Sequence, residues 1–169
     1  MINPENEYKW LRLKSRHCEQ HILSEYGKYL LIPTESECLL SFEETKNIVS
    51  SEFDTIPAPW FVSTVLFKDI WKIKEFIIRY VEFKEEPYYL SSIDGDCSLR
   101  KYRIPNLAVL NLDFPFNTGD GLLFLSSYNK KEQIVLNWYE LNNTFYMDLE
   151  LSNSNRKKWP LYYRKGHIG

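Results

Sequence analysis

The run GLLFLSSYNKKEQIVLNWYELNNTFYMDLEL, residues 121–151, decides the fold class. It contains three segments rich in aliphatic and aromatic residues, at 121–128, 133–141 and 144–151, with an Asn-Asn pair at 142–143 between the last two. Short segments of this composition joined by Asn- and Gly-containing turns are typical of antiparallel hairpins. The run therefore predicts consecutive antiparallel strands.

The last of these segments alternates as a half-buried strand does. One face is apolar and consists of Phe145, Met147, Leu149 and Leu151. The other face carries Tyr146, Asp148 and Glu150. Two further segments, 97–104 and 106–114, also have strand-like composition. We therefore expect a C-terminal antiparallel meander after Glu86.

The first third of the chain predicts helices. Asn3 and Pro4 provide a cap and a favoured first helical residue, so we expect a helix from about Pro4 to Tyr26. Ser41 and Glu44 have the spacing of a capping box and predict the start of a second helix. The short apolar segment at 28–33, ended by a proline, predicts a strand between the two.

The centre of the chain is ambiguous. Residues 60–67 predict a strand, whereas 69–83 fit either helical spacing or strand alternation, and we favour a helix there. The whole of 1–169 is expected to form a single α+β domain, with N-terminal helices packed on an antiparallel β-sheet.

Composition narrows the class of protein. Of the 169 residues, 44% are hydrophobic and 26% charged, which is ordinary for a globular domain, whereas the aromatic content of 16% is high. No secretory signal or membrane-spanning run is visible, so we expect a cytoplasmic protein with no membrane association. Three cysteines at wide spacings fit a reducing compartment.

The motifs of known chemistry are absent from the sequence. There is no nucleophile elbow, and the six glycines form no phosphate-binding loop. His17 and His21 supply too few ligands for a metal site, and Asp94 with Asp96 suits a turn better than a cation site. We therefore expect no enzyme activity, metal or cofactor. The alternative is an enzyme or small-ligand binder whose site gathers dispersed Asp and His residues, with Asp113 and Asp120 as further candidates.

Charge is distributed unevenly along the chain. The segment Glu35–Asp54 holds six acidic residues and one base, and Arg156–Lys165 holds five bases and no acid. The formal net charge of -2 argues against a protein that binds nucleic acid mainly through phosphates. A second alternative is nevertheless an RNA-binding module that uses the basic, aromatic C-terminal tail.

The chain combines high aromatic content with separated charges, and it has neither catalytic motifs nor an export signal. In these respects the chain resembles the small immunity proteins that bacteria pair with secreted nuclease toxins, including those of contact-dependent growth inhibition. The resemblance implies an inhibitor that binds one cognate toxin tightly, either over the toxin's active site or by pairing strands at a sheet edge.

Under this hypothesis the acidic segment meets a basic surface of the toxin, with aromatic anchors near the centre of the contact. The expected partner-binding residues are Glu43, Glu44, Glu52, Asp54, Trp60 and Tyr88. The expected function is therefore a cytosolic protein-binding module, an immunity protein that neutralises its toxin.

Overall fold

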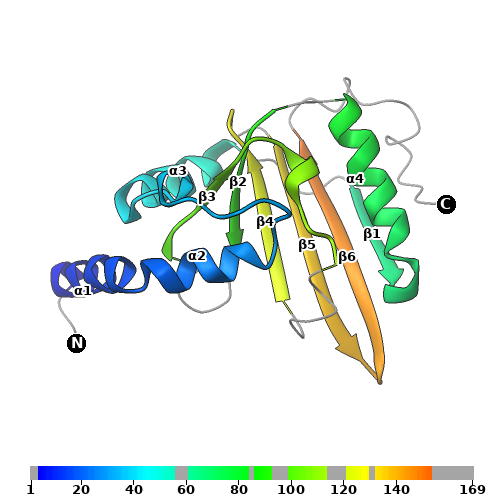
Figure 1. Ribbon diagram of the computed structural model, residues 1–169, viewed down its shortest axis with the longest axis horizontal. Coiled ribbons are helices and arrows are strands. Elements are labelled where there is room, and N and C mark those ends of the chain that lie inside the picture. Colours follow the sequence, from blue (N-terminus) through cyan, green and yellow to red (C-terminus); the bar gives the residue numbers. More distant parts are fainter. Residues whose placement is uncertain are drawn as a thin grey trace.

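A six-stranded antiparallel sheet organises the computed structural model, which describes residues 4–55, 61–83, 86–92, 99–113, 121–129 and 132–153 (Figure 1). The strands lie in the order β1-β6-β5-β4-β2-β3. The helices are α1 (Pro4–His17), α2 (Glu19–Gly27), α3 (Phe42–Thr55) and α4 (Trp71–Phe83). The strands are β1 (Phe61–Leu66), β2 (Tyr88–Ser92), β3 (Tyr102–Ile104), β4 (Gly121–Ser127), β5 (Glu132–Leu141) and β6 (Thr144–Asn153). Short 3-10 helices are η1 (Ser36–Cys38), η2 (Phe67–Asp69) and η4 (Leu107–Val109).

The two faces of the sheet are covered differently. On the core face, α2 and α4 bury residues such as Tyr26 and Phe76 against the strands in one large apolar cluster (Figure 1). On the outer face, α3 packs Ile48 against Tyr89 in a small second cluster. Because Tyr88 and Tyr89 are consecutive in β2, their side chains point to opposite faces, which places α3 opposite α2 and α4.

The predicted α+β class, with its C-terminal meander, is confirmed in β4, β5 and β6. The last two strands pair from Leu141↔Thr144 onward. Asn142 and Asn143 join them with φ of 52° and 58°, the conformation of a two-residue hairpin turn that Asn tolerates.

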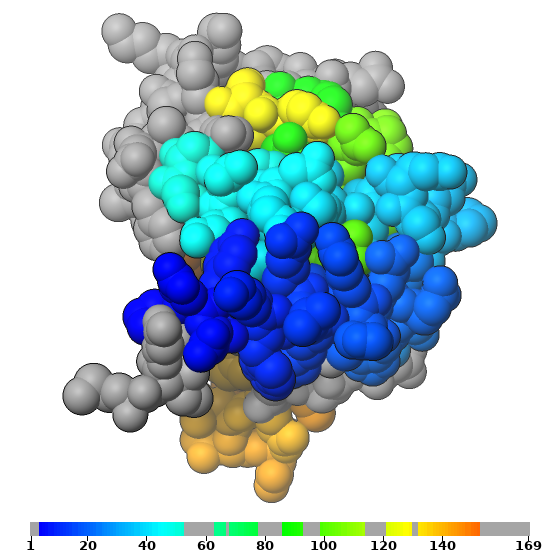
Figure 2. All heavy atoms as spheres, turned by 90° about the vertical axis from the view of Figure 1, so that its left-hand side faces the viewer, coloured from blue at the N-terminus to red at the C-terminus, as the bar shows by residue number. Residues whose placement is uncertain are grey.

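Several predicted elements are wrong. The first helix is broken at Cys18, because α1 packs against α3 through Tyr8 and Phe42, with ring centroids 5.4 Å apart (Figure 2), whereas α2 packs into the main core. Residues 28–33 form only one isolated bridge, Leu30↔Leu110, in place of a strand. In the segment 106–114, the Asn106 side chain accepts from the Ala108 N–H at 2.9 Å and caps η4 where a strand was expected.

Other predictions concern the centre of the chain and the order of the strands. Residues 69–83 do contain the favoured helix, α4, and the strand expected at 60–67 is β1 over its described residues. The expected strand at 97–104 is limited, in its described part, to β3. Sequence analysis missed β2, which lies between β3 and β4, and the pairing of β1 with β6.

Candidate functional site

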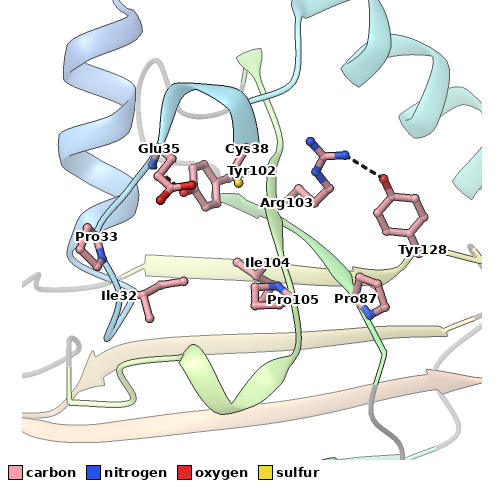
Figure 3. A pocket seen from close by; sticks show the side chains of 10 residues that line it. All are labelled: Ile32, Pro33, Glu35, Cys38, Pro87, Tyr102, Arg103, Ile104, Pro105 and Tyr128. Carbon is pink, nitrogen blue, oxygen red and sulfur yellow. Dashed lines mark hydrogen bonds between the residues drawn. The ribbon is translucent and has the colours of Figure 1, made fainter.

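A hollow of about 630 Å³ lies where β3 ends, and we call it the β3 groove (Figure 3). Its lining is mainly apolar and comes from four separate parts of the chain. The lining residues are Ile32, Pro33, Glu35, Cys38, Pro87, Tyr102, Arg103, Ile104, Pro105 and Tyr128. Cavities of this volume with apolar walls and a few polar groups are typical of binding sites.

One wall of the β3 groove is made by the segment that crosses the edge of β3. Leu39 forms an isolated bridge with Tyr102, and the Leu40 N–H donates to the Lys101 carbonyl at 2.9 Å. The hydroxyl of Tyr102 accepts a hydrogen bond from the Glu35 N–H at 2.9 Å. These contacts fix η1, and with it Cys38, beside the groove.

The polar end of the β3 groove is built by Arg103 and Tyr128. The Arg103 guanidinium donates to the Tyr128 hydroxyl at 3.2 Å and to the Glu37 carbonyl at 3.0 Å (Figure 3). The Tyr128 ring stacks on Tyr89 at 4.6 Å and is 41% exposed. The hydrogen bond from Arg103 lowers the pKa of Tyr128, whereas burial, followed by the contact with Tyr128, raises the pKa of Tyr89 to about 12. The wall is thus a rigid stack with one exposed aromatic edge.

The Cys38 thiol lies beside the Tyr102 side chain in the wall of the groove (Figure 3). Burial is the main cause that raises the pKa of Tyr102, so this phenol is neutral at physiological pH and is not a base for the thiol. Nucleophilic catalysis needs a base beside the nucleophile. Tyr102 therefore does not take this role for Cys38, and its hydroxyl serves in the groove as the acceptor for the Glu35 N–H.

One carboxylate lines the β3 groove and two others belong to the segments that carry its wall. Glu35 and Glu37 are exposed on and beside η1, and Glu44 is exposed in the first turn of α3. The hydrogen bonds of Glu44 to Ser41 lower its pKa, so its carboxylate is charged at neutral pH. Its charge also acts on Arg103 and Tyr128, which places it in the electrostatic field of the groove. We call these three residues the acidic rim.

The structure separates the sequence-predicted partner-binding residues. Glu43 is half-exposed and pairs with Arg12 at 2.6 Å, and Glu44 belongs to the acidic rim. The expectation that Tyr88 is an exposed anchor is wrong, because it is 0% exposed on the core face of β2. The Asp54 side chain and Trp60 lie outside the described residues.

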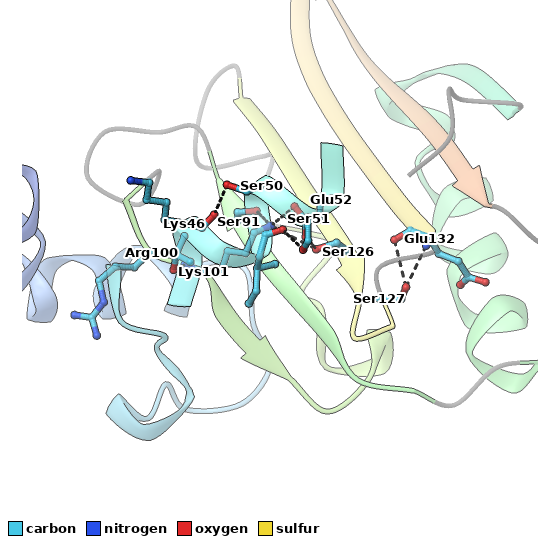
Figure 4. A network of polar contacts seen from close by, with 12 residues as sticks. Lys46, Ser50, Ser51, Glu52, Ser91, Arg100, Lys101, Ser126, Ser127 and Glu132 are labelled. Atoms are coloured by element: carbon cyan, nitrogen blue, oxygen red, sulfur yellow. Dashed lines mark hydrogen bonds and ion pairs between the residues drawn. The ribbon is translucent and has the colours of Figure 1, made fainter. Parts of the chain in front are cut away.

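Glu52 is also wrong as a docking residue, since it is 8% exposed beneath α3 (Figure 4). Its carboxylate pairs with the Lys101 ammonium at 3.0 Å and accepts a hydrogen bond from the Ser126 hydroxyl. Lys101 also donates to the Ser91 hydroxyl at 3.2 Å. Thr45, Ile48 and Glu52 recur at helical spacing, and all three are buried. This spacing was the sequence signal that Glu52 faces inward.

The dispersed residues of the alternative enzyme hypothesis are not brought together in the described structure. His17 and His21 are exposed on different helices, α1 and α2, and Asp113 is exposed elsewhere. Asp94, Asp96, Asp120 and the basic tail at 156–165 lie outside the described residues. Within the described ranges, no three His, Cys, Asp or Glu side chains lie close enough to hold a metal ion.

Sequence reasoning missed Arg103 and Tyr128, because an arginine in a short strand and a tyrosine before a turn carry no motif.

Comparisons with family models, curated proteins and solved structures find no match for this chain. None of the described helices has the length and apolar character needed to cross a membrane.

Proposed function

We propose that this chain is a protein-binding module that docks a basic partner at the β3 groove. The observation that carries the proposal is the combination of an apolar hollow with the acidic rim formed by Glu35, Glu37 and Glu44. A partner suited to this surface places an apolar side chain in the hollow and lysines or arginines around it. Such an arrangement concentrates binding energy in the buried anchor, while the charges speed association and select the partner.

The proposal keeps the expected partner, a protein with a basic surface, but places the contact at the β3 groove and not at Glu52 and Tyr88. Glu52 points inward from α3 and Tyr88 lies in the core, whereas Glu44 is exposed in the first turn of α3, where its charge acts on Arg103 and Tyr128. Nuclease-type toxins bind nucleic acid phosphates and therefore carry basic surfaces. An immunity protein that neutralises such a toxin is the form of the proposal that the resemblance supports.

A peptide pair tests the groove directly. The probes are the N-acetylated, C-amidated peptides KKWKK and EEWEE, titrated into the full chain and followed by amide NMR shifts. We expect KKWKK to shift the amides of Cys38, Arg103 and Tyr128, and EEWEE to leave them unchanged. Shifts that are equal for both peptides, or that lie away from the groove, would show that the acidic rim does not select the ligand.

Two charge-matched variants sharpen this test. Glu35→Lys with Glu37→Lys reverses two carboxylates of the rim, and we expect it to weaken KKWKK binding at least about tenfold, equivalent to about 1.4 kcal/mol. Glu7→Lys with Glu140→Lys makes the same change in net charge at other exposed sites. The control pair is expected to bind within about twofold of the original chain.

The immunity form needs its own experiment. The genes on either side are searched for a toxin-sized reading frame, its product is co-expressed with this chain, and bacterial growth and nuclease activity are measured. We expect the unaltered chain to protect and the Glu35→Lys, Glu37→Lys variant to protect less. A neighbouring toxin that stays active when mixed with the purified chain would overturn the immunity form.

A small-ligand binder is the second candidate, favoured by the volume of the β3 groove and by the Arg103 guanidinium in its wall. The chemistry fits an aromatic carboxylate, with the ring against the prolines and the carboxylate near Arg103. Titration with 4-hydroxybenzoate distinguishes the candidates. Saturable shifts of groove amides by this probe, without shifts by KKWKK, would favour the small ligand.

A further inference from the structure

The two edges of the sheet differ in how they are protected. At one edge β3 has only three residues, is crossed by Leu39 and is followed directly by Pro105. Short length, a covering segment and proline are the usual ways in which edge strands are kept from pairing with other chains. The β3 edge is therefore closed to a further strand.

At the other edge, β1 has none of these protections within the part of the chain that the structure describes. Its sequence, FVSTVL, has no charge, no proline and no glycine, and it is rich in residues that favour strands. Among the described residues, β6 is the only segment joined to β1 by backbone hydrogen bonds. In an antiparallel strand every second residue directs its N–H and C=O away from the paired neighbour. The free side of β1 thus presents backbone donors and acceptors along about 20 Å.

The chemistry of β1 fits a second copy of itself. Like charges placed opposite each other destabilise a strand pair, and a strand without charges avoids this in a self-pairing. A two-fold axis perpendicular to the sheet can pass through Ser63 or Thr64. In either case odd-numbered residues of one copy lie opposite odd-numbered residues of the other, and even-numbered opposite even-numbered. Such pairs come from the same face of each copy, so both core faces stay on one side.

The closed β3 edge determines the size of the assembly. Pairing of β1 with β3 of the next copy would continue indefinitely as a fibre, whereas β1 with β1 uses both free edges and closes. We propose that β1 pairs antiparallel with β1 of a second copy, which joins the two six-stranded sheets into one closed dimer. The two β3 grooves then lie at the far ends of the joined sheet, because β1 and β3 are the outermost strands in the order.

Sedimentation equilibrium of the full chain, from roughly micromolar to millimolar concentration, tests the proposal. We expect the mass to rise from the 20.3 kDa of one chain to twice that value. A single 20.3 kDa species throughout would overturn the proposal, including the case in which β1 accepts a strand only from a different protein.

Two threonine variants locate the contact. Thr64 is exposed at the centre of β1, so Thr64→Lys adds a charge at the edge without entering the core. We expect it to weaken dimerisation at least about tenfold. Thr144→Lys makes the same change on the same face of β6, one strand inside, and is expected to leave the dimer intact. Dimerisation that both variants retain would place the interface elsewhere.

Hydrogen exchange of the unaltered chain provides a check that needs no variant. The outward amides of β1 should exchange more slowly as the concentration rises, while exposed amides of α1 keep constant rates. Exchange in β1 that is independent of concentration, in a sample that sediments as a dimer, would contradict pairing through this edge.

Discussion

Lys101, which directly precedes β3, and Glu52 of α3 form a buried ion pair, with exposed fractions of 3% and 8%. Such a pair is held in place by its hydrogen bonds, here to Ser91 and Ser126, and losing one partner leaves the other charge buried alone. We expect Lys101→Met to lower the free energy of unfolding in urea by about 3–5 kcal/mol.

The controls for Lys101→Met use the same measurement. Adding Glu52→Leu is expected to restore most of the loss, because the uncompensated carboxylate is then gone. Lys28→Met breaks the exposed pair with Glu25 and is expected to cost less than about 1 kcal/mol. Equal losses for Lys28→Met and Lys101→Met would show that burial does not govern the pair.

The same lysine predicts a pH dependence of stability. Desolvation by burial is the largest cause that lowers the pKa of Lys101 below 10.5, against the opposing charge of Glu52. Between the folded and unfolded pKa values the unfolded chain binds more protons, so the contribution of Lys101 to the free energy of unfolding rises with pH up to about 10.5.

Tyr89 acts in the opposite direction, since its pKa is raised to about 12 in the folded chain and the stability linked to it is lost as pH rises through that value. The comparison therefore uses urea unfolding of the original chain and of the Lys101→Met, Glu52→Leu variant at pH values up to 10.5. We expect the difference in their stabilities to grow with pH in favour of the original chain. Parallel pH profiles would contradict the assignment to Lys101.

At the scale of elements, α3 depends on its capping box. The Ser41 hydroxyl accepts from the Glu44 N–H at 3.2 Å, and the Glu44 carboxylate accepts from the Ser41 N–H at 2.8 Å. We expect Ser41→Ala to lower the free energy of unfolding by about 0.5–2 kcal/mol, because the Glu44 N–H in the first turn of α3 loses its acceptor. Ser24→Ala, at an exposed position inside α2, is the control and is expected to be neutral or slightly stabilising. No difference between the two would mean that α3 does not need the cap.

Elements with strong local signals were predictable from sequence, and the others were not. The cap of α3 and the Asn142–Asn143 turn are encoded within a few residues, so pattern reasoning found both. β2 was missed because Tyr88, Tyr89 and Leu90 are all buried, which removes the alternation that identifies a strand. Residues 28–33 have a strand-like composition but make only one bridge, and no local pattern reports the absence of a partner.

The candidate site, like the fold, was predictable from sequence only in part. The acidic segment was visible in the sequence, and Glu44 of that segment does lie on the rim. The β3 groove was not visible, since it forms only when the bridge between Leu39 and Tyr102 brings η1 to the sheet edge and β2 places Pro87 nearby. Long-range pairing, which sequence periodicity does not encode, creates the hollow.

In the whole molecule, the strand order separates the surface proposed to bind a partner from the surface proposed to form the dimer. The β3 groove and the free side of β1 are at opposite edges of a sheet of six strands, about 24 Å apart by the spacing between strands. The main apolar cluster extends between them, from Ile104 in β3 to Val65 in β1. Because this one cluster includes residues from all six strands, we expect a single cooperative unfolding transition for the described part of the chain.

This separation predicts that binding and dimerisation respond to different variants. Thr64→Lys should weaken the dimer and leave the affinity for the KKWKK peptide within about twofold, because sites this far apart without shared partners act additively. Tyr128→Ala removes an exposed wall of the groove and should weaken peptide binding while leaving the sedimentation profile unchanged. The two variants are measured side by side by amide NMR and sedimentation equilibrium. If Thr64→Lys also weakened the peptide, the groove would depend on the dimer, and the partner would have to be recognised by two copies together.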